Sequence, residues 1–153
     1  MQNVHTWAVF STTLNLVLSS TCFIIASVQS PSREQKLMQT VTFFLLLLFL
    51  GYWGTATVST ANRELLIFTT KVQYFSACNI VLFILVLYAR LLETRLPRWF
   101  IAILALWSAF LTVLTMTFDL HTYYYSTFKV ILERGRWILK KNYAWGHTLF
   151  FIT

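Results

Sequence analysis

The amino-acid sequence predicts an all-α fold: a polytopic membrane helical bundle with four transmembrane helices, a short interfacial hairpin or helix, and the start of a fifth helix. The first observation is composition. Of the 153 residues, 58% are hydrophobic and 11% are charged, whereas soluble domains carry roughly 25% charged residues. The second is a mean hydropathy of +0.66. The third is a set of four apolar runs that can cross a hydrocarbon core of roughly 30 Å. We therefore expect a single membrane domain over residues 1–153.

The four predicted spans are joined by short polar connections, and they cover residues 7–28, 38–58, 65–89 and 99–117. Lipid offers the backbone no hydrogen-bond partner, so apolar spans of this length are expected to be helices. The N-terminus lacks the basic segment of a secretory signal peptide, which predicts that the first span stays in the mature protein.

Residues 118–142 form a long, basic and aromatic connection that is expected to lie on the membrane surface. The pieces "TFKVILE" and "RWILKK" alternate around Gly135 and favour a short β-hairpin. A short interfacial helix also fits, with an apolar face made of Tyr124, Phe128, Ile131 and Leu132. Residues 143–153 indicate the opening of a fifth helix, because a segment of about ten residues does not span a bilayer.

Small and hydroxyl-bearing residues recur at steps of three and four in three of the predicted spans. Such stripes let helices approach closely in lipid and hydrogen-bond across the contact. A packed helical bundle explains them without a pore or a transport path. The residues predicted to pack helices together are Asn15, Gly51, Thr55, Ser108 and Thr112, and Ser19, Cys22 and Ser59 continue the same stripes.

No catalytic or metal-binding motif is visible, so we expect neither enzymatic activity nor a metal or other cofactor. The histidines (His5, His121 and His147) make no metal-ligand spacing, and the glycines make no phosphate-binding loop. Cys22 and Cys78 lie mid-way along apolar runs and are expected to be small buried hydrophobes. The net charge of +7 falls in short clusters between apolar runs. This placement favours the lipid bilayer, and not nucleic acid, as the partner.

The stretch "RELLIFTTKVQY" (residues 63–74) places Glu64 and Lys71 at the head of the third span, two helical turns apart. A charged side chain at bilayer depth costs about 2.5–3.5 kcal/mol or more. One interpretation is that Glu64 marks the aqueous end of the helix while Lys71 snorkels back to the same interface. The other is that Lys71 faces the bundle interior and meets an acid. Asp119, at the same-side end of the fourth span, is the acid available.

Asp119 and His121 adjoin three consecutive tyrosines at 123–125. An aromatic belt at the membrane interface would account for the tyrosines, and a ligand-contacting rim is the alternative. We predict that five residues line the outer end of the bundle as the polar part of a signal-sensing pocket roofed by residues 122–142. They are Glu64, Lys71, Tyr74, Asp119 and His121.

Several stretches together resemble the N-terminal seven-helix membrane region of bacterial sensor histidine kinases, a region also found on cyclic-di-nucleotide synthases. "ELLIFTTKVQYF" resembles the opening of its third helix, with Glu64, Lys71 and Tyr74 at the matching positions. "RLPRW" resembles its loop into the fourth helix, "TFDLHTYYY" its polar and aromatic stretch after that helix, and "RGRWILKKNYAWGH" its approach to helix five. Asp119 departs from the pattern, which is expected to have Asn there.

The resemblance implies a membrane sensor or receptor domain of a two-component or related signal-transduction protein. It would detect a small-molecule or peptide signal at the outer face and pass it to a cytoplasmic output domain beyond residues 1–153. The chain would then hold the first four helices and the start of the fifth, and the full-length protein would form a homodimer. The alternative function is a small orphan structural subunit of a larger membrane complex, packed against partner membrane subunits.

The resemblance also implies the bacterial cytoplasmic membrane, with the N-terminus outside. Basic residues that flank the spans do not decide the orientation, because the positive-inside rule gives a near tie. The predicted cytoplasmic side carries five of them and the predicted outer side six: Arg33, Lys36, Arg90, Arg95 and Arg98 against Arg63, Lys129, Arg134, Arg136, Lys140 and Lys141.

Overall fold

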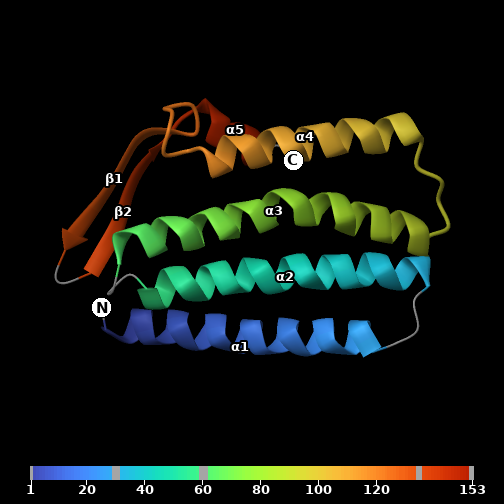
Figure 1. The fold of residues 1–153 in the computed structure, drawn as a ribbon, viewed down its shortest axis with the longest axis horizontal. Coiled ribbons are helices and arrows are strands. Elements are labelled where there is room, and N and C mark those ends of the chain that lie inside the picture. Colours follow the sequence, from blue (N-terminus) through green and yellow to red (C-terminus); the bar gives the residue numbers. More distant parts are fainter. Residues whose placement is uncertain (1, 29–31, 59–61, 134–135, 152–153) are drawn as a thin grey trace.

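The structure is a computed structural model that describes residues 2–28, 32–58, 62–133 and 136–151 (Figure 1). These residues form four long helices, a two-stranded sheet and a short helix, in that order. The elements are α1 (Gln2–Val28), α2 (Arg33–Val58), α3 (Arg63–Leu91), α4 (Arg98–Met116), β1 (Tyr125–Glu133), β2 (Arg136–Tyr143) and α5 (Trp145–Phe151).

Helices α1 to α4 run side by side in alternating directions (Figure 1), and each is long and apolar enough to cross a membrane. This agrees with the four predicted spans. All four helices begin earlier than predicted, α1 and α2 by five residues, because polar residues ahead of each apolar run also join the helix. Ser32 caps α2 by accepting a hydrogen bond from the Gln35 backbone N–H at 3.2 Å. Asn62 caps α3 by accepting one from the Glu64 N–H at 2.8 Å.

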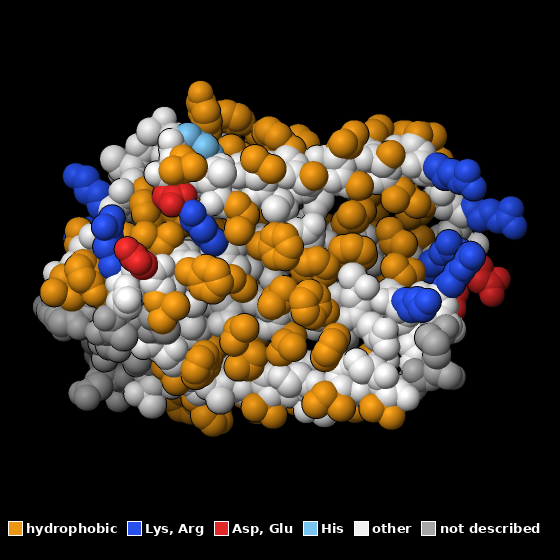
Figure 2. All heavy atoms as spheres, in the orientation of Figure 1, with side chains coloured by type: hydrophobic (Ala, Val, Ile, Leu, Met, Phe, Trp, Pro, Cys, Tyr) orange, Lys and Arg blue, Asp and Glu red, His pale blue; other side chains and the backbone are white. Residues whose placement is uncertain are grey.

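The two ends of the bundle differ in structure. The hairpin end is where α2 ends, α3 begins, α4 ends and the two strands lie, and the loop end is where α2 and α4 begin (Figure 1). Figure 2 shows hydrophobic side chains over the middle of the visible face, with Lys, Arg, Asp and Glu gathered towards the two ends. Large side chains such as Trp7, Ile24 and Leu106 are exposed on the outside of the helices. This distribution suits a protein whose middle contacts lipid and whose ends contact water.

The connection after α4 folds as a β-hairpin, so the interfacial helix considered from the sequence is wrong. The all-α prediction therefore holds for the spans and not for this connection. Strands β1 and β2 pair antiparallel, with Ile131 opposite Ile138. Tyr143, predicted to open the fifth helix, instead pairs with Tyr125 in the sheet, and α5 begins at Trp145. Gly135, Ser59 and the chain end at 152–153 lie outside the described residues.

A register irregularity in β1 aims aromatic side chains at the helices. The pairing shifts between Tyr125 and Thr127, which changes the alternation of faces along the strand. As a result Tyr125 is buried and Phe128, three residues on, is half-buried, and their rings stack with centroids 5.8 Å apart. The hairpin thus presents an aromatic face to the ends of α3 and α4.

Helix packing follows the small residues only in part. Gly51 is buried, and a Cβ there would lie 2.8 Å from the Gln73 backbone nitrogen, so glycine is what lets α2 approach α3 so closely. Asn15 and Thr55 are half-buried, and the Thr55 hydroxyl donates to the Tyr52 carbonyl of its own helix at 2.9 Å. Cys22 is exposed on α1, so its prediction as a buried hydrophobe is wrong, whereas Cys78 is buried.

Candidate functional site

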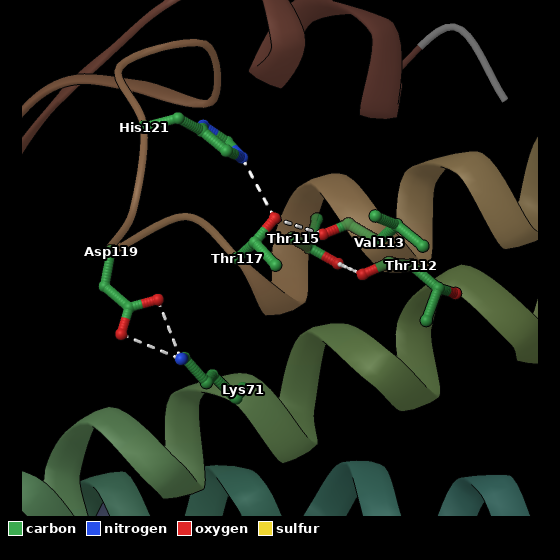
Figure 3. A network of polar contacts seen from close by, with 7 residues as sticks. All are labelled: Lys71, Thr112, Val113, Thr115, Thr117, Asp119 and His121. Carbon is green, nitrogen blue, oxygen red and sulfur yellow. Dashed lines mark hydrogen bonds and ion pairs between the residues drawn. The ribbon is translucent and has the colours of Figure 1, made fainter.

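Lys71 and Asp119 form an ion pair at the hairpin end. The Lys71 Nζ lies 2.7 Å from Asp119 Oδ1 and donates a hydrogen bond of 2.9 Å to Oδ2. Lys71 projects from α3 towards the turn that follows α4, where Asp119 points back at it (Figure 3). The structure thus confirms that Lys71 meets an acid and that the acid is Asp119, but the pair lies at a partly exposed position and not in the bundle interior, as that interpretation had it.

The pair is only partly shielded from the surroundings. The Lys71 and Asp119 side chains keep 23% and 30% of their surface exposed, and the Lys71 ammonium also lies 5.6 Å from the centre of the Phe118 ring. An ammonium over an aromatic face gains roughly 0.5–1 kcal/mol at exposed sites. The arrangement ties α3 to the end of α4 and leaves both charges within reach of a competing ion.

Next to the ion pair lies a buried aromatic cluster that holds the hairpin on the helices. Its members come from α3, the end of α4 and the start of the hairpin: Tyr74, Leu114, Phe118, Tyr124 and Tyr125. The Tyr74 and Tyr125 hydroxyls are hydrogen-bonded to each other, and the rings of Tyr124 and Tyr125 meet edge to face with centroids 4.7 Å apart. Burial of large aromatic rings is the main stabilising contribution here.

Burial also fixes the protonation of two of these tyrosines. It raises the pKa of the Tyr124 and Tyr125 hydroxyls well above the ordinary value of 10.0, and the neighbouring Tyr74 raises them further. Both hydroxyls are therefore neutral at physiological pH, and that of Tyr125 is the one bonded to the Tyr74 hydroxyl.

Lys141 completes the cluster and was missed by the sequence analysis, which counted it only as a basic residue of the connection. Its ammonium donates to the hydroxyls of Tyr74 at 3.2 Å and Tyr125 at 3.4 Å. It also lies 5.4 to 5.7 Å from the ring centres of Tyr74, Tyr125 and Tyr143. The sequence feature that could have identified Lys141 is its position two residues before Tyr143 in a strand.

His121 lies beside this site but does not face the ion pair, contrary to the prediction that both line one pocket. Its ring points towards Thr117, at the end of α4 (Figure 3). The Tyr123 backbone N–H donates to Nδ1 at 3.2 Å, so Nε2 carries the proton and donates to the Thr117 hydroxyl at 3.1 Å. His121 therefore shapes the turn that carries Asp119.

Glu64 also stands apart from the pair. It occupies the exposed first turn of α3, where a carboxylate interacts favourably with the helix N-terminus, and within the described residues it forms no ion pair with Lys71. The structure therefore brings Lys71, Tyr74 and Asp119 together and leaves Glu64 and His121 outside that group.

Deeper in the bundle, α3 and α4 are joined by polar contacts. Ser108 donates to the Cys78 carbonyl at 2.9 Å and to Asn79 Oδ1 at 3.2 Å, and the Asn79 amide donates to the Thr112 hydroxyl at 3.1 Å. Ser108 and Thr112 thus make the interhelical hydrogen bonds expected of them. Asn79, their partner on α3, was not singled out from the sequence.

Within the described residues, no three His, Cys, Asp or Glu side chains come together as a metal site. Comparison of the chain with models of protein families, with curated proteins and with solved structures finds no match.

Proposed function

We propose that this chain is a sensory membrane domain, and that the Lys71–Asp119 pair together with the docked hairpin is its signal-responsive element. The observation that carries the proposal is the ion pair. A lysine roughly 12 Å along α3 from its first residue makes membrane insertion less favourable than leucine would. Its partner lies in a different segment, and both charges remain partly exposed.

The element works as a clamp with two arrangements. In the closed arrangement Lys71 holds Asp119, and the adjacent Phe118 stays in the aromatic core beneath the hairpin. A ligand with an acidic group competes with Asp119 for the ammonium, which frees the turn after α4 and loosens the hairpin. A signal shifts such an equilibrium only by its difference in affinity for the two arrangements. The polar contacts between α3 and α4 then carry the shift along the bundle.

In this proposal the hairpin end faces outwards from the bacterial cytoplasmic membrane, and the signal is a small molecule or peptide. The resemblance to the seven-helix sensor region supports this orientation. An output domain in the cytoplasm, a histidine kinase or a cyclic-di-nucleotide synthase, would follow in the full-length protein, which would act as a homodimer.

The second candidate is a structural subunit of a larger membrane complex. The hydrogen bonds of Ser108 and Asn79 favour it, because a bundle held together in this way needs no further role. The reading frame after Thr153 separates the two candidates: a sensor requires further helices and an output domain.

The functional test is the output of the full-length protein in membranes. Lys71→Met is expected to shift the basal output or the response to signal while membrane abundance stays normal. The matched control is Lys140→Met, since Lys140 forms an exposed pair with Glu133 at 3.6 Å on the hairpin surface and such pairs contribute little. Output that is the same for Lys71→Met and wild type would refute the sensory role of the pair.

A further inference from the structure

At the loop end, opposite the proposed signal-responsive element, a pocket of about 620 Å³ opens between the start of α2, the end of α3 and the start of α4. Three arginines and a threonine line it, together with two glutamates: Arg90, Arg95, Arg98, Thr94, Glu34 and Glu93. Figure 2 shows Lys and Arg side chains gathered at this end, beside acidic ones. The volume lies in the range of small-ligand sites.

The net charge of the lining indicates the charge of the ligand. Three guanidinium groups and two carboxylates leave a net charge of +1, which a monoanion neutralises. Within the described residues none of the three arginines is in a salt bridge, so their planar donor groups are available. A guanidinium presents paired N–H groups that match two oxygens of a phosphate.

The backbone around the pocket favours an anion as well. The Ala89 carbonyl near the end of α3 is already satisfied, because the Thr94 N–H donates to it at 2.9 Å and the Thr94 hydroxyl at 3.1 Å. At the start of α4, Pro97 provides no side-chain hydrogen bond to the first N–H groups of the helix. The positive end of α4 therefore adds to the positive charge of Arg98 in the same wall.

Two residues next to the lining in the sequence are large, apolar and exposed. Leu92 and Trp99, which flank the lining residues in the sequence, are 70% and 65% exposed. Exposed apolar and aromatic side chains near the end of a membrane span favour the boundary between headgroups and acyl chains. A ligand that joins a phosphate to acyl chains would contact both the arginines and these apolar side chains.

We propose that the pocket binds a phosphodiester monoanion, as in the headgroup of an anionic phospholipid. A phosphomonoester dianion or a diphosphate matches the net charge of the lining less well. The proposal does not depend on the sensory role of the hairpin end, because the pocket lies at the other end of the bundle.

The test compares lipid binding by variants that remove the same charge from different places. Native mass spectrometry would count phosphatidylglycerol bound to the detergent-solubilised protein, with phosphatidylcholine of the same acyl chains as the zwitterionic reference. Arg95→Gln/Arg98→Gln removes two charges from the pocket, whereas Arg33→Gln/Lys36→Gln removes two from exposed positions at the same end that do not line it. We expect the pocket variant to bind phosphatidylglycerol at least about tenfold more weakly and the control variant to bind as wild type does.

Two further arms make the result decisive. Glycerophosphoglycerol, the same diester without acyl chains, shows whether the natural ligand is a lipid or a soluble molecule. If it fails to displace phosphatidylglycerol, the ligand is a membrane lipid. If it displaces the lipid at equal concentration, the ligand is a soluble phosphodiester. Arg95→Lys/Arg98→Lys keeps the charge and the fold but loses the paired donors, and it is expected to weaken binding as well. Equal binding by wild type and both pocket variants, or equal binding of phosphatidylcholine and phosphatidylglycerol, would overturn the proposal.

Discussion

The ammonium of Lys71 lies 2.7 Å from the carboxylate of Asp119, a residue 48 positions further along the chain. The two charges come from α3 and from the turn after α4, so one contact fixes the relative position of two helices at their hairpin ends. The aromatic cluster of the hairpin docks immediately beside it, through Phe118. A change at this contact therefore reaches α3, α4 and the hairpin together.

Replacing Asp119 and replacing Lys71 are expected to change the stability of the bundle differently. Asp119→Asn leaves the partly buried Lys71 ammonium without its counter-ion, and we expect the folded bundle to lose about 1 kcal/mol. Lys71→Met also removes the penalty for inserting the charge, so its effect on stability is expected to be near zero or stabilising. Reversible unfolding in mixed micelles measures both. Equal losses in the two variants would contradict this asymmetry.

The close approach of α2 and α3 gives a second prediction, from two neighbouring glycines. A Cβ on Gly51 would meet backbone atoms of Gln73 at 2.8 and 2.9 Å, whereas one on Gly54 would meet the Thr69 side chain, with Cγ2 at 2.5 Å. Backbone cannot move aside without shifting a helix, so Gly51→Ala is expected to cost about 1–3 kcal/mol. In Gly54→Ala a rotation of Thr69 relieves the contact with Cγ2, although the Thr69 Cβ at 3.0 Å stays in place, so the loss is expected to be smaller than for Gly51→Ala; both variants gain roughly 1 kcal/mol in helix propensity. Unfolding midpoints compare the two, and a larger loss for Gly54→Ala would refute the packing described.

The buried tyrosines predict a loss of hairpin docking at alkaline pH. The pKa of the Tyr124 and Tyr125 hydroxyls is raised in the folded chain above 10.0, chiefly by burial, while in an undocked hairpin they ionise near 10. The docked form is therefore fully stable below about pH 10 and loses stability above it, because the undocked form releases protons first.

Unfolding measured between about pH 8 and pH 11 tests this sign. Wild type is expected to weaken steeply above pH 10, and Tyr124→Phe/Tyr125→Phe is expected to start weaker, since Tyr125 loses its bond to Tyr74, but to depend less on pH. The same pH dependence in both proteins would show that other groups are responsible.

The two native cysteines test which side of each helix faces lipid. Cys22 is exposed on α1 and Cys78 is buried between α3 and α4, with its sulfur 3.7 Å from the Thr115 hydroxyl. In a bilayer, a lipid-soluble maleimide is expected to modify Cys22 and spare Cys78, and a membrane-impermeant, water-soluble maleimide is expected to modify neither. The single variants Cys22→Ala and Cys78→Ala assign the label, and preferential modification of Cys78 would contradict the arrangement of the bundle.

Much of the fold could be predicted from the sequence because long apolar runs leave the backbone only helical solutions in lipid. The alternation of "TFKVILE" and "RWILKK" favoured a hairpin, but the same residues also fitted a helix, and only the pairing of Ile131 with Ile138 decided between them. The partnership of Lys71 with Asp119 followed from two antiparallel neighbours with a short loop.

The rest of the site depended on side-chain direction, which residue spacing does not give. His121 is two residues from Asp119, yet His121 points towards Thr117 while Asp119 points towards Lys71 (Figure 3). Lys141 lies opposite Phe128 in the sheet, and the contact of its ammonium with Tyr74 depends on how the hairpin docks on α3. Cys22 belongs to a stripe of small residues on α1, but it lies beyond the edge of the contact with α2, where Ala26 is buried.

The sensory role of the ion pair is tested most directly by reversing its charges in the full-length protein and measuring basal output in membranes. Lys71→Glu and Asp119→Lys are each expected to shift the output, because each places two like charges at the contact, and the double variant is expected to restore it. The parallel set Lys140→Glu and Glu133→Lys on the hairpin surface controls for net charge, and Glu64→Gln controls for an acid on α3 outside the pair. The account predicts restored output in the Lys71→Glu/Asp119→Lys protein and little change in the controls. Wild-type output from both single reversals, at normal membrane abundance, would contradict it.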